Sequence, residues 1–275
     1  MLGKLIKHEW RAFWKIPAFV SLFLAIFTVF GVIALNAKIW ETENPVIQSL
    51  SVFVLMFYYI AIIVISFVSI LYTALRFYKN IYSDEGYLMH TLPVTQKSLI
   101  ISKLIVSYAW TIIIGLVIIC SVFTLLFALI SSTGMDVTFF VLISQMIDAL
   151  SNSGFLEEFK ELFGFGFVHF LILMLVFCIL APIYSILMIY TSISLGQLFK
   201  KHKVLGSILS YIGIYVVLQI IGSFVSAPVM FSSAELENFT TFGPMLYFYL
   251  AEMIALSIVF FFVTEFIMKK KLNLD

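Results

Sequence analysis

The chain has 275 residues, of which 63% are hydrophobic and 11% are charged. A soluble domain carries about 25% charged residues, so this composition excludes water as the main solvent and predicts an integral membrane protein. The formal net charge of +1 excludes a general attraction to nucleic acid, and we expect no nucleic-acid partner.

The first 15 residues have the pattern of a helix that lies on a membrane surface. Apolar and aromatic side chains, among them Trp10 and Trp14, fall on one helical face, whereas Lys4, Lys7 and Arg11 fall on the other. Tryptophan is enriched at the boundary between headgroups and hydrocarbon. A simple positive retention signal would explain the lysines but not the aromatic stripe. The sequence therefore predicts an amphipathic interfacial helix over 1–15.

Six segments are long and apolar enough to cross a bilayer as helices, which needs roughly 20 residues at about 1.5 Å per residue. Five of them contain runs without Asp, Glu, Lys or Arg, and the sixth is interrupted by Glu252 and Glu265. We therefore expect an all-α membrane protein with a single transmembrane domain. Its six spans are predicted at about 16–36, 48–76, 98–130, 168–198, 204–227 and 245–268.

The positive residues indicate which way the spans face. Of the 16 lysines and arginines, 14 precede span one, follow span six, or lie around the connections between spans two and three and between spans four and five. Positive residues near span ends stay on the cytoplasmic side. We expect a multi-pass protein of the cytoplasmic membrane with both termini inside, and an extracellular loop over 131–166. Within that loop, 155–163 has the spacing of a small amphipathic helix.

The connection between spans two and three carries signals for a short helix of its own. Ser83 is a favourable N-cap, Asp84 and Glu85 fall in the first turn, where the helix dipole favours negative charge, and Pro93 closes the segment. The sequence therefore predicts a cytoplasmic helix over 83–95, with an ordinary connecting turn as the alternative.

Two further features of this connection support the helix. Thr95 is placed to cap the next long helix. Tyr87, Leu88 and Leu92 are apolar residues on a short polar loop, and such side chains stay exposed unless another surface covers them. This pattern favours the helix over an ordinary connecting turn.

Polar residues inside the spans are candidates for a transport path, because a charge at the bilayer centre costs at least about 2.5 to 3.5 kcal/mol. Glu252 lies one and a half to two turns inside the predicted outer end of span six, where it could snorkel, accept hydrogen bonds, be protonated or face a water-filled cavity. Glu265 is expected to pair with Lys269, four residues on. Span two places polar residues on one face, and association with another helix is the alternative to a path lining. These residues are Ser66, Ser69, Thr73 and Arg76.

No motif for catalysis, nucleotide binding or metal binding is present. The sequence lacks GxxxxGK[ST], HExxH and GxSxG. Cys120 and Cys178 lie in apolar runs without a pairing motif, and we expect them to be buried small hydrophobes. The chain is therefore expected not to be an enzyme and to bind no cofactor or metal itself.

The order of these parts resembles the ABC-2 type permease (transmembrane) subunits of bacterial ATP-binding cassette exporters. The similarity is closest over 83–103, from Ser83 through Leu92-Pro93-Val94-Thr95 to Lys103. The resemblance implies that 83–95 is the coupling helix, which sits in a cleft of a separate ATPase. Its coupling residues would be Ser83, Asp84, Glu85, Gly86, Tyr87, Leu88, Leu92 and Pro93.

The resemblance also implies partners and cargo. Two ATPase subunits would bind ATP and Mg, and a second permease chain would complete an exporter of an amphipathic or apolar peptide, drug or lipid. Two other functions are compatible with the residues themselves. One is an ion-coupled secondary transporter in which Glu252 carries the proton, and the other is a non-transporting scaffold or sensor.

Overall fold

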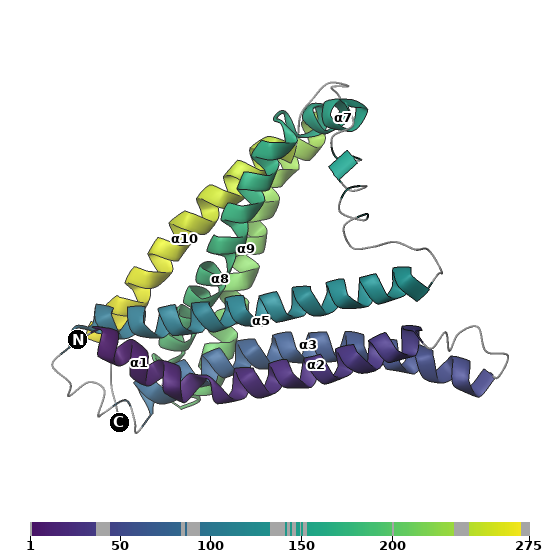
Figure 1. Ribbon diagram of the computed structural model, residues 1–275. Coiled ribbons are helices and arrows are strands. Elements are labelled where there is room, and N and C mark those ends of the chain that lie inside the picture. Colours follow the sequence, from purple (N-terminus) through teal and green to yellow (C-terminus); the bar gives the residue numbers. More distant parts are fainter. Residues whose placement is uncertain are drawn as a thin grey trace. The chain divides into compact units, whose positions relative to one another are not determined.

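A computed structural model describes residues 2–36, 45–83, 86, 94–132, 141, 144, 147, 148, 150, 153–199, 201–233 and 242–270. These residues form helices and short connections, with no strand among them. Six of the helices are long and apolar enough to cross a membrane. The chain is therefore an all-helical membrane protein with six candidate spans, as its composition predicts (Figure 1).

The helices follow the predicted spans and extend beyond several of their ends. Helix α3 continues past the predicted end at 76, and α9 continues past 227 even though Pro228 follows there, because helices can continue beyond the hydrocarbon. The helices are α1 (Leu2–Phe13), α2 (Lys15–Asn36), α3 (Pro45–Tyr82), α5 (Gln96–Ser132), α7 (Ser153–Phe163), α8 (Phe167–Gly196), α9 (Lys203–Ser233) and α10 (Phe242–Lys270).

The chain divides into two compact units. Unit 1 comprises Met1–Leu75 and Ile105–Met146, and unit 2 comprises Arg76–Leu104 and Ile147–Asp275. The boundary passes through α3 and α5. The end of α3 and the start of α5, which flank the predicted coupling segment, therefore belong to the same unit as α8, α9 and α10.

Unit 1 is held by an apolar core and a chain of hydroxyl groups. Leu24, Ile65 and Leu125 are among the buried residues of the core. The Thr28 hydroxyl donates to the Leu24 carbonyl at 2.8 Å and lies 2.8 Å from the Ser121 hydroxyl, which lies 2.6 Å from the Tyr58 hydroxyl. Each hydroxyl has one proton to donate. Because Thr28 donates to the Leu24 carbonyl, Ser121 must donate to Thr28, and Tyr58 must donate to Ser121. These bonds join α2, α3 and α5.

Helix α1 forms as the sequence predicts, and aromatic contacts join it to α3 and α5 within unit 1. Phe13 is buried edge-on against Tyr72 with ring centroids 4.7 Å apart, and the Trp10 ring lies 5.1 Å from the Trp110 ring. Trp10 and Trp14 remain exposed. The position of α1 at a membrane surface stays a prediction.

In unit 2, α8 packs against both α9 and α10 (Figure 1). Its second half is almost continuously buried from Ile186 to Gly196. The Thr191 hydroxyl lies 3.0 Å from the Phe260 carbonyl and 3.1 Å from the Thr264 hydroxyl of α10. Hydrogen bonds of this kind strengthen helix association in lipid. Gly196 permits the close approach of α9, because a Cβ there would overlap the backbone of Ser207.

The small helix predicted at 155–163 is present as α7. Its phenylalanines stack with those that begin α8, and Phe159 contacts Phe163, Phe167 and Phe170 with centroids 4.4 to 5.2 Å apart. Gly164 ends α7 with φ 77° and donates its N–H to the Lys160 carbonyl at 2.8 Å. Glycine suits this left-handed position because it has no Cβ.

The expectation for the two cysteines was wrong. The side chains of Cys120 and Cys178 are both exposed. A helix whose whole surface is apolar does not reveal from sequence which side faces its neighbours, because lipid accepts a small apolar side chain as readily as a protein interior does.

Candidate functional site

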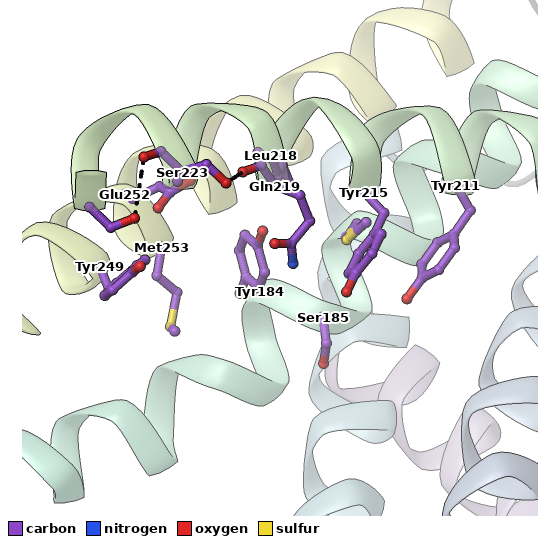
Figure 2. A pocket seen from close by; sticks show the side chains of 13 residues that line it. Tyr184, Ser185, Tyr211, Tyr215, Leu218, Gln219, Ser223, Tyr249, Glu252 and Met253 are labelled. Carbon is purple, nitrogen blue, oxygen red and sulfur yellow. Dashed lines mark hydrogen bonds between the residues drawn. The ribbon is translucent and has the colours of Figure 1, made fainter. Parts of the chain in front are cut away.

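Unit 2 contains a pocket of about 510 Å³ between α8, α9 and α10. Pockets of about 300 to 1,000 Å³ are typical of small-molecule sites. Figure 2 shows that side chains from all three helices face this space. Its lining residues are Tyr184, Ser185, Met188, Tyr211, Tyr215, Leu218, Gln219, Gly222, Ser223, Ser226, Tyr249, Glu252 and Met253.

The pocket is rich in aromatic and small polar side chains. Tyr184 comes from α8, Tyr211 and Tyr215 from α9, and Tyr249 from α10. In Figure 2, Tyr249 and Glu252 lie at one end, Tyr211 and Tyr215 at the other, and Tyr184 between them. Several of the hydroxyl groups bond to their own helices, and Ser223 donates to the Gln219 carbonyl at 2.7 Å. The rings and the Gln219 amide are therefore the groups best suited to meet a ligand.

Glu252 supplies the charge of the pocket. It lies ten residues after Phe242, the first residue of α10, or roughly 15 Å along the helix. The other charged residues of α8, α9 and α10 in the described part are Lys203, Glu265, Lys269 and Lys270, all at the opposite end of these helices. Within the described ranges, no lysine or arginine forms an ion pair with Glu252.

A proline in α8 lies just before the pocket. Pro182 precedes Tyr184 by two residues and has no N–H for the carbonyl one turn earlier. A proline inside a helix interrupts the backbone hydrogen bonds between successive turns and is a common cause of a kink. Ser185 donates to the Pro182 carbonyl at 3.0 Å, which anchors the turn that carries Tyr184.

The other predicted path residues do not line this pocket. The Ser66 hydroxyl is exposed and donates to the Ile62 carbonyl at 2.9 Å, and the buried Thr73 hydroxyl donates to the Ser69 carbonyl at 3.0 Å. Bonds back to the preceding turn satisfy such hydroxyl groups without a cavity. Ser69 and Arg76 are partly buried. A role of this face in a path stays a prediction.

A second functional candidate is the base of the 83–95 segment, by which we mean the end of α3 and the start of α5 together with the residues of α8 and α10 that they contact. The Phe77 ring of α3 stacks on the Tyr190 ring of α8, with centroids 3.7 Å apart and planes 8° from parallel. One turn further, the Tyr82 hydroxyl donates to the Ser194 hydroxyl at 2.7 Å. Phe77, Ile81 and Tyr190 are almost completely buried. The end of α3 is thus joined to the buried half of α8.

The start of α5 contacts the end of α10. The Lys97 ammonium lies 3.8 Å from a carboxylate oxygen of Glu265, and Glu265 accepts a hydrogen bond from Lys269. The predicted pair of Glu265 and Lys269 is confirmed. Glu265 is buried at 5% exposure, whereas the lysine side chains are about half exposed.

Parts of the predicted coupling segment itself are described. The Ser83 hydroxyl donates to the Lys79 carbonyl at 2.5 Å, and the Gly86 N–H donates to the Ser83 carbonyl at 2.7 Å. Thr95 caps α5 as predicted, because its hydroxyl accepts the Ser98 N–H at 3.3 Å. The remaining coupling residues lie outside the described residues; they are Asp84, Glu85, Tyr87, Leu88, Leu92 and Pro93.

Sequence reasoning found Glu252 but missed the rest of the pocket. A usable signal was present in α9, where Tyr211, Tyr215, Gln219 and Ser223 recur every four residues along a span without charges. A repeat of four places these residues on one helical face. The partners on α8 could not be found in this way, because only the tertiary structure selects which turn of α8 faces them.

Comparison with known proteins adds no identification, since no family model, curated protein or solved structure matches the chain. In the part of the chain that the structure describes, no group of three or more metal-ligating side chains is present. Function therefore has to be argued from the pocket and from the contacts at the base of the 83–95 segment.

Proposed function

We propose that this protein is the permease subunit of an ATP-binding cassette exporter of the ABC-2 type. It would move an amphipathic or apolar substrate across the cytoplasmic membrane, driven by two ATPase subunits that bind ATP and Mg. A second permease chain, identical or different, would complete the transporter. The 83–95 segment would receive the motion of the ATPase.

The contacts at the base of the 83–95 segment carry this proposal. A coupling element works only if its displacement reaches the helices that line the substrate path. Here the end of α3 stacks and hydrogen-bonds to α8 through Phe77 and Tyr82, and the start of α5 meets Glu265 of α10. The pocket lies between α8, α9 and α10. A force on the segment would therefore reach two of the three pocket helices, α8 through buried rings and α10 through the ion pair of Lys97 with the buried Glu265 carboxylate.

The proposal is tested by copurification. The chain is expressed with an affinity tag in its native cells, and the purified fraction is assayed for ATP hydrolysis that vanadate inhibits. We expect an ATPase to copurify with the unaltered chain. The double substitution Tyr87→Asp and Leu88→Asp should release it, because charged groups would replace the apolar docking surface predicted on the segment.

The matched control is Leu198→Asp with Phe199→Asp. Leu198 and Phe199 are apolar and exposed, and they lie in the connection between α8 and α9, at the end of these helices that is predicted to be cytoplasmic. The control should keep the ATPase. Equal retention of an ATPase by both double variants, or no ATPase with the unaltered chain, would contradict the proposal.

Glu252 favours a second candidate function, an ion-coupled secondary transporter. A carboxyl group that lines a pocket within a span, without an ion pair among the described residues, can carry a proton. This function predicts transport in vesicles that follows a proton gradient without ATP and disappears in Glu252→Gln. A non-transporting scaffold or sensor would show neither this transport nor substrate-dependent ATP hydrolysis.

A further inference from the structure

We infer that the pocket between α8, α9 and α10 binds an organic monocation with an apolar body, which Glu252 and the tyrosine rings recognise together. As the substrate class of the exporter, this inference deepens the proposed function and rests on it. The binding site itself can be tested without any ATPase.

The electrostatics of the pocket favour a cation. Among the described residues that line the pocket, Glu252 is the charged one and none is a lysine or arginine. The faces of aromatic rings carry partial negative charge and attract cations that lie within about 6 Å of the ring centre. Tyr184, Tyr215 and Tyr249 add such faces from three different helices (Figure 2). An anion would meet repulsion from the carboxylate and would find no opposite charge among the described lining residues.

The chemistry of the lining excludes a bare metal ion as the preferred ligand. Calcium takes six to eight oxygen ligands, usually including several carboxylates. The described lining of this pocket offers one carboxylate, and the described residues hold no cluster of metal-ligating side chains. The volume of about 510 Å³ is also far larger than a metal ion needs. A molecule of drug size fits both facts.

The apolar part of the lining fits the body of such a molecule. Met188 and Met253 flank the rings, and Leu218 adds an aliphatic wall. Methionine is flexible and polarizable, so it adapts to ligands of different shapes. Tyr211, Tyr215 and Tyr249 are 41%, 52% and 41% exposed, so their ring faces are accessible to a ligand. The site therefore suits a bulky cation rather than a small polar one.

The test uses tetraphenylphosphonium as the probe, because it is an organic monocation with a large apolar body. Saturable binding to the purified full-length chain is measured by equilibrium dialysis in detergent, as the part displaced by excess unlabelled probe. The chain should bind the probe at one site. Glu252→Gln should weaken the affinity by about tenfold, because it removes the charge and keeps the size.

Two controls separate recognition from a general effect of charge or fold. Glu158→Gln on α7 makes the same change at an exposed site outside the pocket and should leave the affinity unaltered. Tetraphenylborate has the same shape with a negative charge; dialysed alone, because the two ions pair with each other, it should show no saturable binding. Tyr215→Leu should weaken binding by about fivefold, whereas Tyr215→Phe should keep it within about twofold, because the ring and not the hydroxyl attracts the cation.

The possible outcomes are distinct. Absence of saturable probe binding, wild-type affinity in Glu252→Gln, or equally tight saturable binding of tetraphenylborate alone would each overturn the inference. If Glu252→Gln does not fold, as judged by gel filtration, the comparison of Tyr215→Leu with Tyr215→Phe decides. Probe binding without a copurifying ATPase would support the site and contradict the exporter, whereas an ATPase without probe binding would do the reverse.

Discussion

The Tyr82 hydroxyl of α3 donates a hydrogen bond to the Ser194 hydroxyl of α8, and Ser194 in turn donates to the Tyr190 carbonyl at 2.8 Å. Tyr190 also receives the stacked Phe77 ring. Two side chains on consecutive turns of α3 thus meet one short stretch of α8. This relationship joins the end of α3, which precedes the 83–95 segment, to the rest of unit 2.

Loss of the Tyr82 hydroxyl should weaken the base of the 83–95 segment. Tyr82→Phe removes the donor to Ser194 while the Ser194 bond to the Tyr190 carbonyl remains, so we expect a loss of about 0.5 to 1.5 kcal/mol. Gel filtration after a series of heating steps would detect it as lower thermal stability. Tyr59→Phe is the control, because Tyr59 lies on the same helix at 66% exposure. Equal stability of both variants would show that the bond contributes nothing.

The stacked rings should be energetically coupled. Phe77→Leu and Tyr190→Leu each lose the ring contact, so the double variant should be less destabilised than the sum of the singles, by about 0.5 to 1.5 kcal/mol. A double-mutant cycle measures this difference. Strict additivity of the two substitutions would mean that the stacking observed at 3.7 Å has no energetic role.

The two lysines near Glu265 should contribute differently to the stability of the protein. Lys269→Met should destabilise more than Lys97→Met, because Lys269 hydrogen-bonds the buried carboxylate whereas Lys97 lies 3.8 Å away. Both lysines are half exposed and screened by solvent, so each single loss should stay near or below about 1 kcal/mol. Removing both should exceed the sum of the single losses, because the buried carboxylate would lose its charge partners.

This difference can be measured by thermal unfolding at low and high salt. Salt should reduce the effect of Lys97→Met more than that of Lys269→Met, because a longer ion pair without a direct hydrogen bond is screened more readily. The opposite order of stabilities would contradict the geometry of this cluster.

In unit 1, Ser121 should be the critical member of the hydroxyl chain. Ser121→Ala leaves Tyr58 without its acceptor and Thr28 without one of its partners, and we expect a loss of about 1 to 2 kcal/mol. Thr124→Ala is the matched control, since Thr124 is exposed one turn later and donates only to the Cys120 carbonyl at 2.7 Å. Thermal stability should separate the two variants.

The predicted orientation can be tested by labelling. In a background with Cys120→Ala and Cys178→Ala, Ser83→Cys should resist a membrane-impermeant maleimide in intact cells and react after lysis. Glu158→Cys on α7 should react in intact cells, because the lysine and arginine pattern places it outside. Labelling of Ser83→Cys from the medium would exclude a coupling role for the segment.

The sequence by itself determined the class of protein, the helices and their approximate ends. Long apolar runs leave helices as the structures that satisfy every backbone group in lipid, and local signals such as Thr95 and Lys269 act within one or two turns. The stripe of Tyr211, Tyr215, Gln219 and Ser223 was also readable in principle, because it is periodic along one helix.

Only the tertiary structure decided which helical faces meet. In lipid, apolar side chains serve equally well against neighbours and against the bilayer, so hydrophobicity did not separate buried from exposed sides, as the exposed Cys120 and Cys178 show. The pocket around Glu252 and the bond between Tyr82 and Ser194 join residues far apart in the chain. The pocket depends on how three helices pack and the bond on how two helices pack, which no local pattern encodes.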